Sequence, residues 1–348
     1  MLFFKSKIFH HRPGAPPKVL ALYSDPSIGD IRLRPYLDAL QARGIIADYV
    51  AVDRNMNPMG PPRSFDFTHI WCQRNVSTAQ FRFLNRHASN PIVYDLDDLL
   101  SSPPRYVMKT RQRTLTRMTR CIELAKAVTT PSEELARSLR QDIAAFSGDA
   151  LILKNGCADG EFAIPSRPKQ QIIWTSGYIP LFSRESPYFV ENLAALANKM
   201  DHEVILIGTF EQGIDALFDK VRLVPHLDFR SYREFLRFHA GALAIAPLPT
   251  TLPPDQQRYF DAKSDIKLVD YLGSGIIPIY SSAVPFVNSD LAVPTLAAAS
   301  GDDIIAILRH CIDNYASVAD DVRAHLRNGA LRARSYWELS KTLDHLFL

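Results

Sequence analysis

Residues 261–282 read DAKSDIKLVDYLGSGIIPIYSS and join a helical pattern to a buried strand. The spacing of the apolar residues predicts a helix over about 266–273, which Gly273 and Gly275 end. The apolar run IIPIY then predicts a strand at 276–280 that is buried on both sides, as in parallel sheets covered by helices. The stretch therefore indicates an α/β fold.

The same alternation of strand-length apolar runs and amphipathic stretches extends along the whole chain. In the N-terminal half we expect strands at 18–24, 45–52, 68–73, 92–95, 127–130 and 151–153. In the C-terminal half we expect them at 172–176, 203–207, 221–224, 243–246 and 276–280. Helices are expected at about 32–43, 78–87, 106–125, 131–141, 187–199, 232–239, 302–315 and 320–334. This order favours two parallel sheets, one in each half.

A chain of 348 residues suits two α/β domains of roughly 150 to 170 residues each. A linker with glycines and prolines at 155–169 separates the halves. The predicted parts are an N-terminal extension at 1–17, an N-terminal domain at 18–160, a C-terminal domain at 161–335 and a helix at 336–348 that packs back on the N-terminal domain. Doubly wound domains bind ligands at the carboxyl ends of their strands, which places the expected site in a crevice between the two.

Composition excludes several classes of protein. The chain is 47% apolar and 22% charged, which is typical of a globular protein. Its net charge of +3 is too small to indicate nucleic-acid binding. Four cysteines without CxxC spacing favour reduced thiols in a cytoplasmic protein, and the histidines have no metal-binding spacing. No stretch approaches the roughly 20 apolar residues that a membrane span needs.

The opening of the helix at 266–273 is the best candidate for a phosphate site. We expect Ser264 to cap this helix, which leaves the backbone N–H groups of Ser264, Asp265 and Ile266 free to bind an anion. Lys263 and Lys267 add positive charge there. Asp270, one turn beyond Lys267, would accept hydrogen bonds from ribose hydroxyls. The alternative is an amphipathic helix whose Lys and Asp residues face solvent.

The stretch KSDIKLVDYLGSGIIPIYSS resembles the donor-binding segment of family 4 (GT4-like) glycosyltransferases. Asp270 matches the second acid of that segment, Gly275 its glycine, Pro278 its proline, and Ser281 or Ser282 its serine. The position of the first acid is occupied by Ala262. LILKNGCADGEF at 151–162 and AVTTPSEELARSL at 127–139 are similar to two further pieces of the same enzymes.

The resemblance implies a GT-B fold, in which two Rossmann-like domains face each other across a cleft. It implies transfer of a sugar from a nucleoside diphosphate-sugar to a glycan or lipid-linked acceptor, with retention of configuration and with no metal or other cofactor, in polysaccharide or surface glycan biosynthesis. Gly177, Arg184 and Ser281 then join the donor site, and Arg184 and Lys267 are the catalytic candidates. The alternative is a non-catalytic GT-B protein that stabilises a partner glycosyltransferase.

Candidates for the acceptor side lie in the N-terminal half. Gly29, in the predicted loop SDPSIGDIRLR, would let backbone N–H groups approach a ligand, and Arg32 follows it. Asp95 and Asp97 end the buried strand in YDLDDLL, the position where such folds place active residues. The alternative is that these acids cap the next helix or pair with arginines.

A basic run without acids occupies residues 105–120. It contains Arg105, Lys109, Arg111, Arg113, Arg117 and Arg120. One interpretation is peripheral contact with the inner face of a membrane or with a lipid-linked pyrophosphate acceptor. The other is a helix face exposed to solvent, as most runs of charged residues are.

Overall fold

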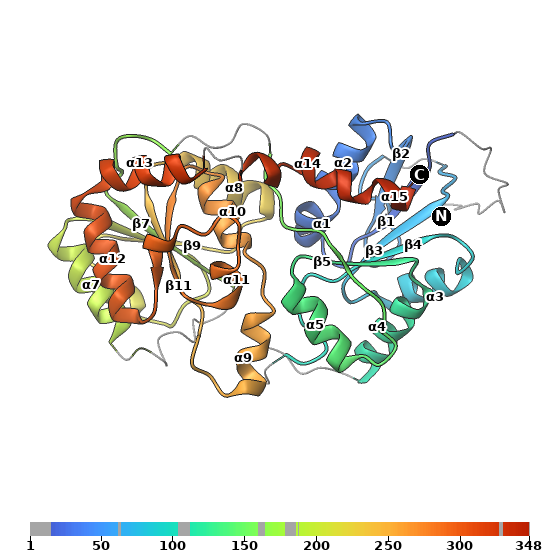
Figure 1. Ribbon diagram of the computed structural model, residues 1–348, viewed down its shortest axis with the longest axis horizontal. Coiled ribbons are helices and arrows are strands. Elements are labelled where there is room, and N and C mark those ends of the chain that lie inside the picture. Colours follow the sequence, from blue (N-terminus) through green and yellow to red (C-terminus); the bar gives the residue numbers. More distant parts are fainter. Residues whose placement is uncertain are drawn as a thin grey trace. The chain divides into compact units, whose positions relative to one another are not determined.

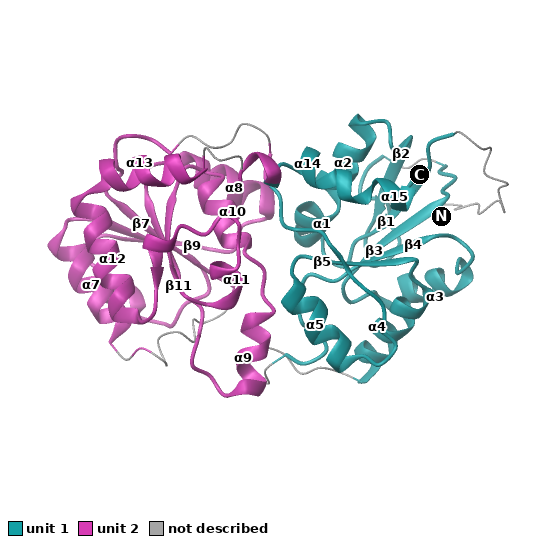
Figure 2. Ribbon diagram, in the orientation of Figure 1, with its two compact units in different colours: residues 1–156, 334–348 teal, residues 157–333 magenta. Residues whose placement is uncertain are grey.

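The computed structural model describes residues 15–61, 64–103, 112–158, 164–177, 186, 188–326 and 330–347. The chain divides into two compact units, shown in Figure 2. Unit 1 consists of residues 1–156 together with 334–348, and unit 2 consists of residues 157–333. The chain therefore passes into unit 2 once and returns to unit 1 for its last residues.

Unit 1 is built on a six-stranded parallel sheet in the order β2-β1-β3-β4-β5-β6. Its strands are β1 (Lys18–Leu22), β2 (Asp48–Val52), β3 (His69–Gln73), β4 (Ile92–Asp95), β5 (Ala127–Thr130) and β6 (Leu151–Ile152). Its helices are α1 (Pro26–Arg32), α2 (Arg34–Ala42), α3 (Thr78–Arg86), α4 (Gln112–Leu124), α5 (Glu133–Asp142), α14 (Tyr336–Ser340) and α15 (Asp344–Phe347). Figure 1 labels these helices and the strands β1 to β5. The strand order changes direction between β1 and β3, which is the switch point of this sheet.

Unit 2 has a second six-stranded parallel sheet, in the order β12-β11-β10-β7-β8-β9. Its strands are β7 (Gln171–Ser176), β8 (Glu203–Gly208), β9 (Val221–Val224), β10 (Leu243–Ala246), β11 (Ile277–Ser281) and β12 (Ala297–Ala298). Its α-helices are α7 (Phe189–Lys199), α8 (Phe229–Phe238), α9 (Pro254–Asp261), α10 (Ile266–Leu272), α11 (Val284–Val287), α12 (Gly301–Asp313) and α13 (Tyr315–Leu326). This is the Rossmann order, with its switch point between β7 and β10.

The buried strands explain the packing of both sheets. Every residue of β4, β10 and β11 is buried. A strand can lose all its exposure only when side chains cover both faces of its sheet, which parallel crossovers through helices provide. The predicted α/β class with two parallel sheets is confirmed.

The C-terminal residues return to unit 1 and pack on its first helices. Tyr336 in α14 meets Tyr36 in α2 edge to face, with ring centroids 5.1 Å apart. The Arg334 guanidinium is 2% exposed and donates to the carbonyl of Asn155 at 3.0 Å. A methyl group on Gly156 would lie 2.6 Å from the Tyr336 ring, so close packing requires a glycine there. The two chain crossings are thus fixed to the same part of unit 1.

Several predicted boundaries are wrong. A loop was predicted at 25–30, but Pro26–Arg32 form the short helix α1, which the side chain of Asp25 caps by accepting from the Ser27 amide. Helix α9 was not predicted at all. Helix α13 begins at Tyr315 instead of at residue 320. The predicted start of the helix at 106–125 lies outside the described residues, and α4 is described from Gln112.

We expect Gly29→Ala to destabilise unit 1 by about 1–3 kcal/mol, because α1 packs directly on the fully buried Tyr23 ring. A Cβ at residue 29 would lie 2.0 Å from Tyr23 Cδ2, so the ring or the helix would have to move. Gly60→Ala is the matched control, because a Cβ there meets nothing within 4 Å. Chemical denaturation measures both changes, and equal stability of the two variants would contradict the packing account.

Candidate functional site

The switch point of unit 2 gathers most of the predicted donor residues. The carboxyl ends of β7 and β10 lie side by side there, since these strands pair in parallel. Helix α10 precedes β11, which pairs with β10. Ligands of doubly wound sheets bind at this edge, where neighbouring loops diverge and leave backbone groups open.

The amine of Lys267 lies at the carboxyl end of β7. Its Nζ donates to the carbonyl oxygen of Thr175, the second-last residue of that strand. Burial, followed by the nearby charge of Lys263, lowers the pKa of Lys267 to about 8. The Asp270 carboxylate, one turn further along the helix, opposes this lowering. The Lys267 amine is thus desolvated at the sheet edge where doubly wound folds bind ligands.

Asp270 is buried one turn further along α10 and is held by an arginine. The Nε and Nη2 atoms of Arg233 in α8 donate to Asp270 Oδ1 at 3.2 and 3.1 Å. The Arg233 guanidinium also stacks over the Phe229 ring at 4.4 Å. Burial raises the pKa of Asp270, and the Arg233 charge opposes this rise. Sequence patterning missed Arg233, because nothing on an amphipathic helix marks which arginine meets an acid 37 residues away.

The opening of α10 differs from the prediction in one respect. The helix begins at Ile266, its cap residue is Asp265, and no side chain caps it, so the expected cap by Ser264 is wrong. The Asp265 carboxylate accepts from Ser289 Oγ at 2.6 Å and is turned toward α11 and its following loop. Among the described residues, the backbone N–H groups of Ile266 and Lys267 have no hydrogen-bond partner.

The remaining donor candidates are spread around the same edge. Ser281 ends β11, is buried, and its Oγ accepts from the Leu248 amide at 2.9 Å, which fixes the loop after β10. Lys263 Nζ contacts the hydroxyl of Tyr259 at 2.7 Å. Gly177 follows β7, is exposed, and a Cβ there would meet nothing within 4 Å. Arg184 lies outside the described residues, and its role stays a prediction.

In unit 1, Asp95 and Arg32 form a buried ion pair at the carboxyl end of β4. The Arg32 Nη2 and Asp95 Oδ1 atoms are 2.7 Å apart, and both side chains are at most 1% exposed. Thr129 Oγ1 also donates to Asp95, at 2.7 Å. Arg32 further donates to Asn155 Oδ1 at 3.2 Å and to the carbonyl of Leu153. These contacts match the arginine-pairing alternative, and they connect the strand ends to the residues that lead into unit 2.

Asp97 and Gly29 also have structural partners. The Asp97 carboxylate pairs with Arg74, and burial raises its pKa while the Arg74 charge opposes the rise. Gly29 lies inside α1 against Tyr23 and not in an open loop, which corrects the predicted reason for this glycine. Their proposed contact with an acceptor stays a prediction.

Two kinds of feature are absent from the described residues. No helix there combines the length and the hydropathy that a membrane span requires. In the same ranges, no group of three or more His, Cys, Asp or Glu side chains gathers in a way that would hold a metal ion.

No protein-family model matches the chain, and no curated protein is detectably similar to it in sequence. Solved structures do resemble it. Sucrose-phosphate synthase from Thermosynechococcus elongatus superposes with a TM-score of 0.64 at 12% identity, over 95% of this chain and 98% of that one. Anabaena HepE, solved in complex with UDP and glucose, gives a TM-score of 0.59 at 13% identity, over 94% and 98% of the two chains.

The same fold also occurs with another activity. A putative UDP-N-acetylglucosamine 2-epimerase from Listeria monocytogenes superposes with a TM-score of 0.52 at 10% identity, over 94% of both chains. The first two neighbours are GT-B glycosyltransferases, and the predicted GT-B fold is confirmed. At these identities the likeness establishes the fold, while membership of family 4 stays a prediction.

Proposed function

We propose that this chain is a GT4-like glycosyltransferase that moves a sugar from a nucleoside diphosphate-sugar to a glycan or lipid-linked acceptor. The observation that carries the proposal is the desolvated Lys267 amine at the carboxyl end of β7, together with backbone N–H groups at the opening of α10 that have no partner among the described residues. The fold supports it, since the neighbours with solved ligands include a protein in complex with UDP and glucose.

The chemistry explains why these groups suit sugar transfer. Breaking the bond between sugar and diphosphate leaves negative charge on the departing phosphate oxygens. Donors that are already oriented stabilise such charge without reorganising. Lys267 and the amides of α10 would bind the diphosphate, and the Asp270 carboxylate, oriented by Arg233, would accept hydrogen bonds from ribose. Retention of configuration and independence of metal are part of the proposal.

A second candidate is a non-catalytic GT-B protein that stabilises a partner glycosyltransferase. Ala262 favours it, because this residue takes the place of the first acid, closes α9 as its cap residue and is fully buried. No carboxylate can therefore reach a sugar from this position.

Calorimetric titration with UDP-, GDP- and dTDP-sugars separates the two functions. We expect one nucleotide class to bind with a dissociation constant between about 1 µM and 1 mM, the usual range of KM values. Mass spectrometry of products formed with that donor then identifies transfer and distinguishes it from epimerisation. A chain that binds none of the three classes would be a scaffold, and the enzyme proposal would be rejected.

A further inference from the structure

Three arginines of unit 1 converge at the carboxyl ends of β1, β2 and β3. Arg54 follows β2, and its Nη1 donates to the carbonyl of Ser24, just after β1, at 3.3 Å. Arg113 and Arg117 project from α4, and both donate to the same Thr78 Oγ1, at 3.1 and 2.6 Å. Ser77, the cap residue of α3, joins the two groups because its Oγ donates to the Arg54 carbonyl at 2.5 Å.

This cluster contains positive charge that no carboxylate of the described residues pairs with. Within the described ranges, Arg54, Arg113 and Arg117 form no ion pair. Their hydrogen-bond acceptors are carbonyl and hydroxyl oxygens, and Arg117 also lies over the Phe81 ring at 5.8 Å. Partial burial, then the charges of Arg113 and Arg54, lower the pKa of Arg117. Each guanidinium has five N–H donors, of which these contacts use one or two.

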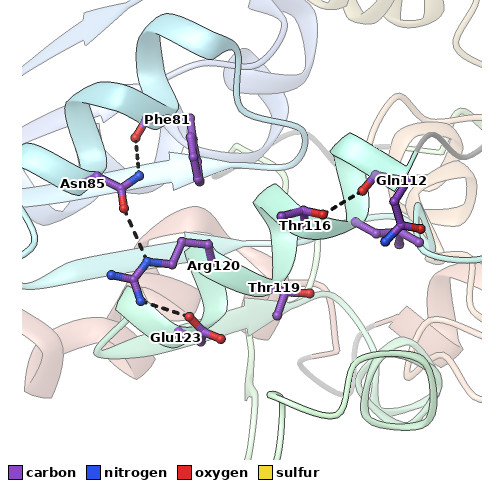
Figure 3. A pocket seen from close by; sticks show the side chains of 8 residues that line it. Phe81, Asn85, Gln112, Thr116, Thr119, Arg120 and Glu123 are labelled. Carbon is purple, nitrogen blue, oxygen red and sulfur yellow. Dashed lines mark hydrogen bonds and ion pairs between the residues drawn. The ribbon is translucent and has the colours of Figure 1, made fainter.

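Another arginine of α4, Arg120, forms an ion pair within its own helix. Arg120 lines a groove of about 510 Å³ between α3 and α4. There its Nη1 pairs with Glu123 at 3.0 Å and its Nε donates to Asn85 at 3.3 Å, as Figure 3 shows. Arg120 is paired with a carboxylate of its own helix, whereas Arg117, three residues earlier, and Arg113, seven residues earlier, have no such partner among the described residues.

The cluster lies where doubly wound sheets bind their ligands. The cluster lies at the switch point of the sheet of unit 1, where the strand order turns between β1 and β3. It also lies at the start of α3, a nine-residue helix whose first amides, at Thr78 and Ala79, have no partner among the described residues. Converging guanidiniums repel one another until an anion binds, and planar guanidinium forks match phosphate oxygens.

We propose that Arg54, Arg113 and Arg117 form a binding site for a phosphoryl or pyrophosphoryl group. The site belongs to unit 1, whereas the proposed donor residues belong to unit 2. If the chain transfers sugars, the group is carried by the acceptor, and that assignment alone rests on the proposed function. The binding site itself does not depend on it.

Titration of the full chain with inorganic pyrophosphate, at constant ionic strength and with UDP in excess, tests the site. UDP occupies the proposed donor residues, so the remaining pyrophosphate binding reports on unit 1. We expect Arg113→Gln and Arg54→Gln each to weaken it about tenfold, the effect of one lost charged hydrogen bond. Arg120→Gln, from the same helix and with the same loss of charge, should bind like the wild type. Both test residues are exposed, so the variants should keep their melting temperature.

A second arm identifies the source of the phosphoryl group. Sedimentation with vesicles of phosphatidylglycerol and phosphatidylcholine in equal amounts is compared with phosphatidylcholine alone. Binding to the anionic vesicles that pyrophosphate displaces identifies a lipid headgroup, and binding of pyrophosphate alone identifies a soluble phosphate compound. In either case, Arg113→Gln and Arg54→Gln must weaken the binding. The proposal is overturned if neither probe binds, or if Arg120→Gln weakens binding as much as Arg113→Gln does. Failure of UDP, GDP and dTDP alike to bind would reject the proposed function and leave this comparison intact.

Discussion

Lys267→Met is expected to weaken binding of the nucleotide-sugar about 10- to 100-fold and to slow transfer about 100- to 1,000-fold. The larger effect on rate follows because the charge on the diphosphate grows as the sugar bond breaks, and Lys267 lies where that charge would be bound. Calorimetry measures the affinity, and initial rates at saturating donor measure the transfer. Lys220→Met is the control, because this lysine of the same unit is exposed and pairs with Asp201 at 2.6 Å.

The pH dependence of donor binding gives an independent check. The pKa of Lys267 is about 8 in the folded protein against 10.5 for a free lysine. Between these values the unfolded chain holds a proton that the folded chain lacks, so this group makes the ligand-free protein more stable as pH rises. Donor binding needs the charged amine and should weaken above pH 8. Both trends should disappear in Lys267→Met, and a donor affinity that is flat from pH 7 to pH 10 in the wild type would contradict the assignment.

Arg32→Met is expected to lower the free energy of unfolding by about 3–5 kcal/mol. The substitution leaves the Asp95 carboxylate, which is fully buried, with Thr129 as its remaining hydrogen-bond donor among the described residues. It also removes the hydrogen bonds from Arg32 to Leu153 and Asn155. These bonds fix the segment of unit 1 that leads into unit 2. Chemical denaturation measures the loss.

Two further variants separate the buried ion pair from a general effect of charge. Arg230→Met removes an exposed arginine that pairs with Glu234 and should cost less than about 1 kcal/mol. The double variant Arg32→Met with Asp95→Leu should recover part of the loss, because no buried charge is then left without a partner. A loss below 1 kcal/mol in Arg32→Met would mean that water reaches Asp95 and that the pair is not structural.

The strands could be predicted well because a strand that is buried on both faces is a continuous apolar run in the sequence. The predicted runs at 92–95 and 127–130 coincide with β4 and β5, and each is an apolar segment between helical patterns. Helix α1 was missed because Pro26 and Gly29 are typical of loops. In the structure Pro26 occupies the first turn, where its missing N–H costs nothing, and Gly29 is dictated by the Tyr23 ring.

The residues of the candidate site could be predicted only where they belong to one continuous segment of the sequence. Lys267 and Asp270 share a face of α10 because they are one turn apart, which is a local property. Arg233 and Asp270 are 37 residues apart, and Arg32 and Asp95 are 63 apart. Such pairs depend on which helix crosses which strand end, and a single sequence does not record that choice.

A crystal structure of the chain with bound UDP tests the central claim most directly. We predict that the diphosphate lies against Lys267 Nζ and the amides of Ile266 and Lys267, with the ribose on the Asp270 carboxylate. UDP bound away from the carboxyl ends of β7 and β10, or against residues other than these, would contradict it.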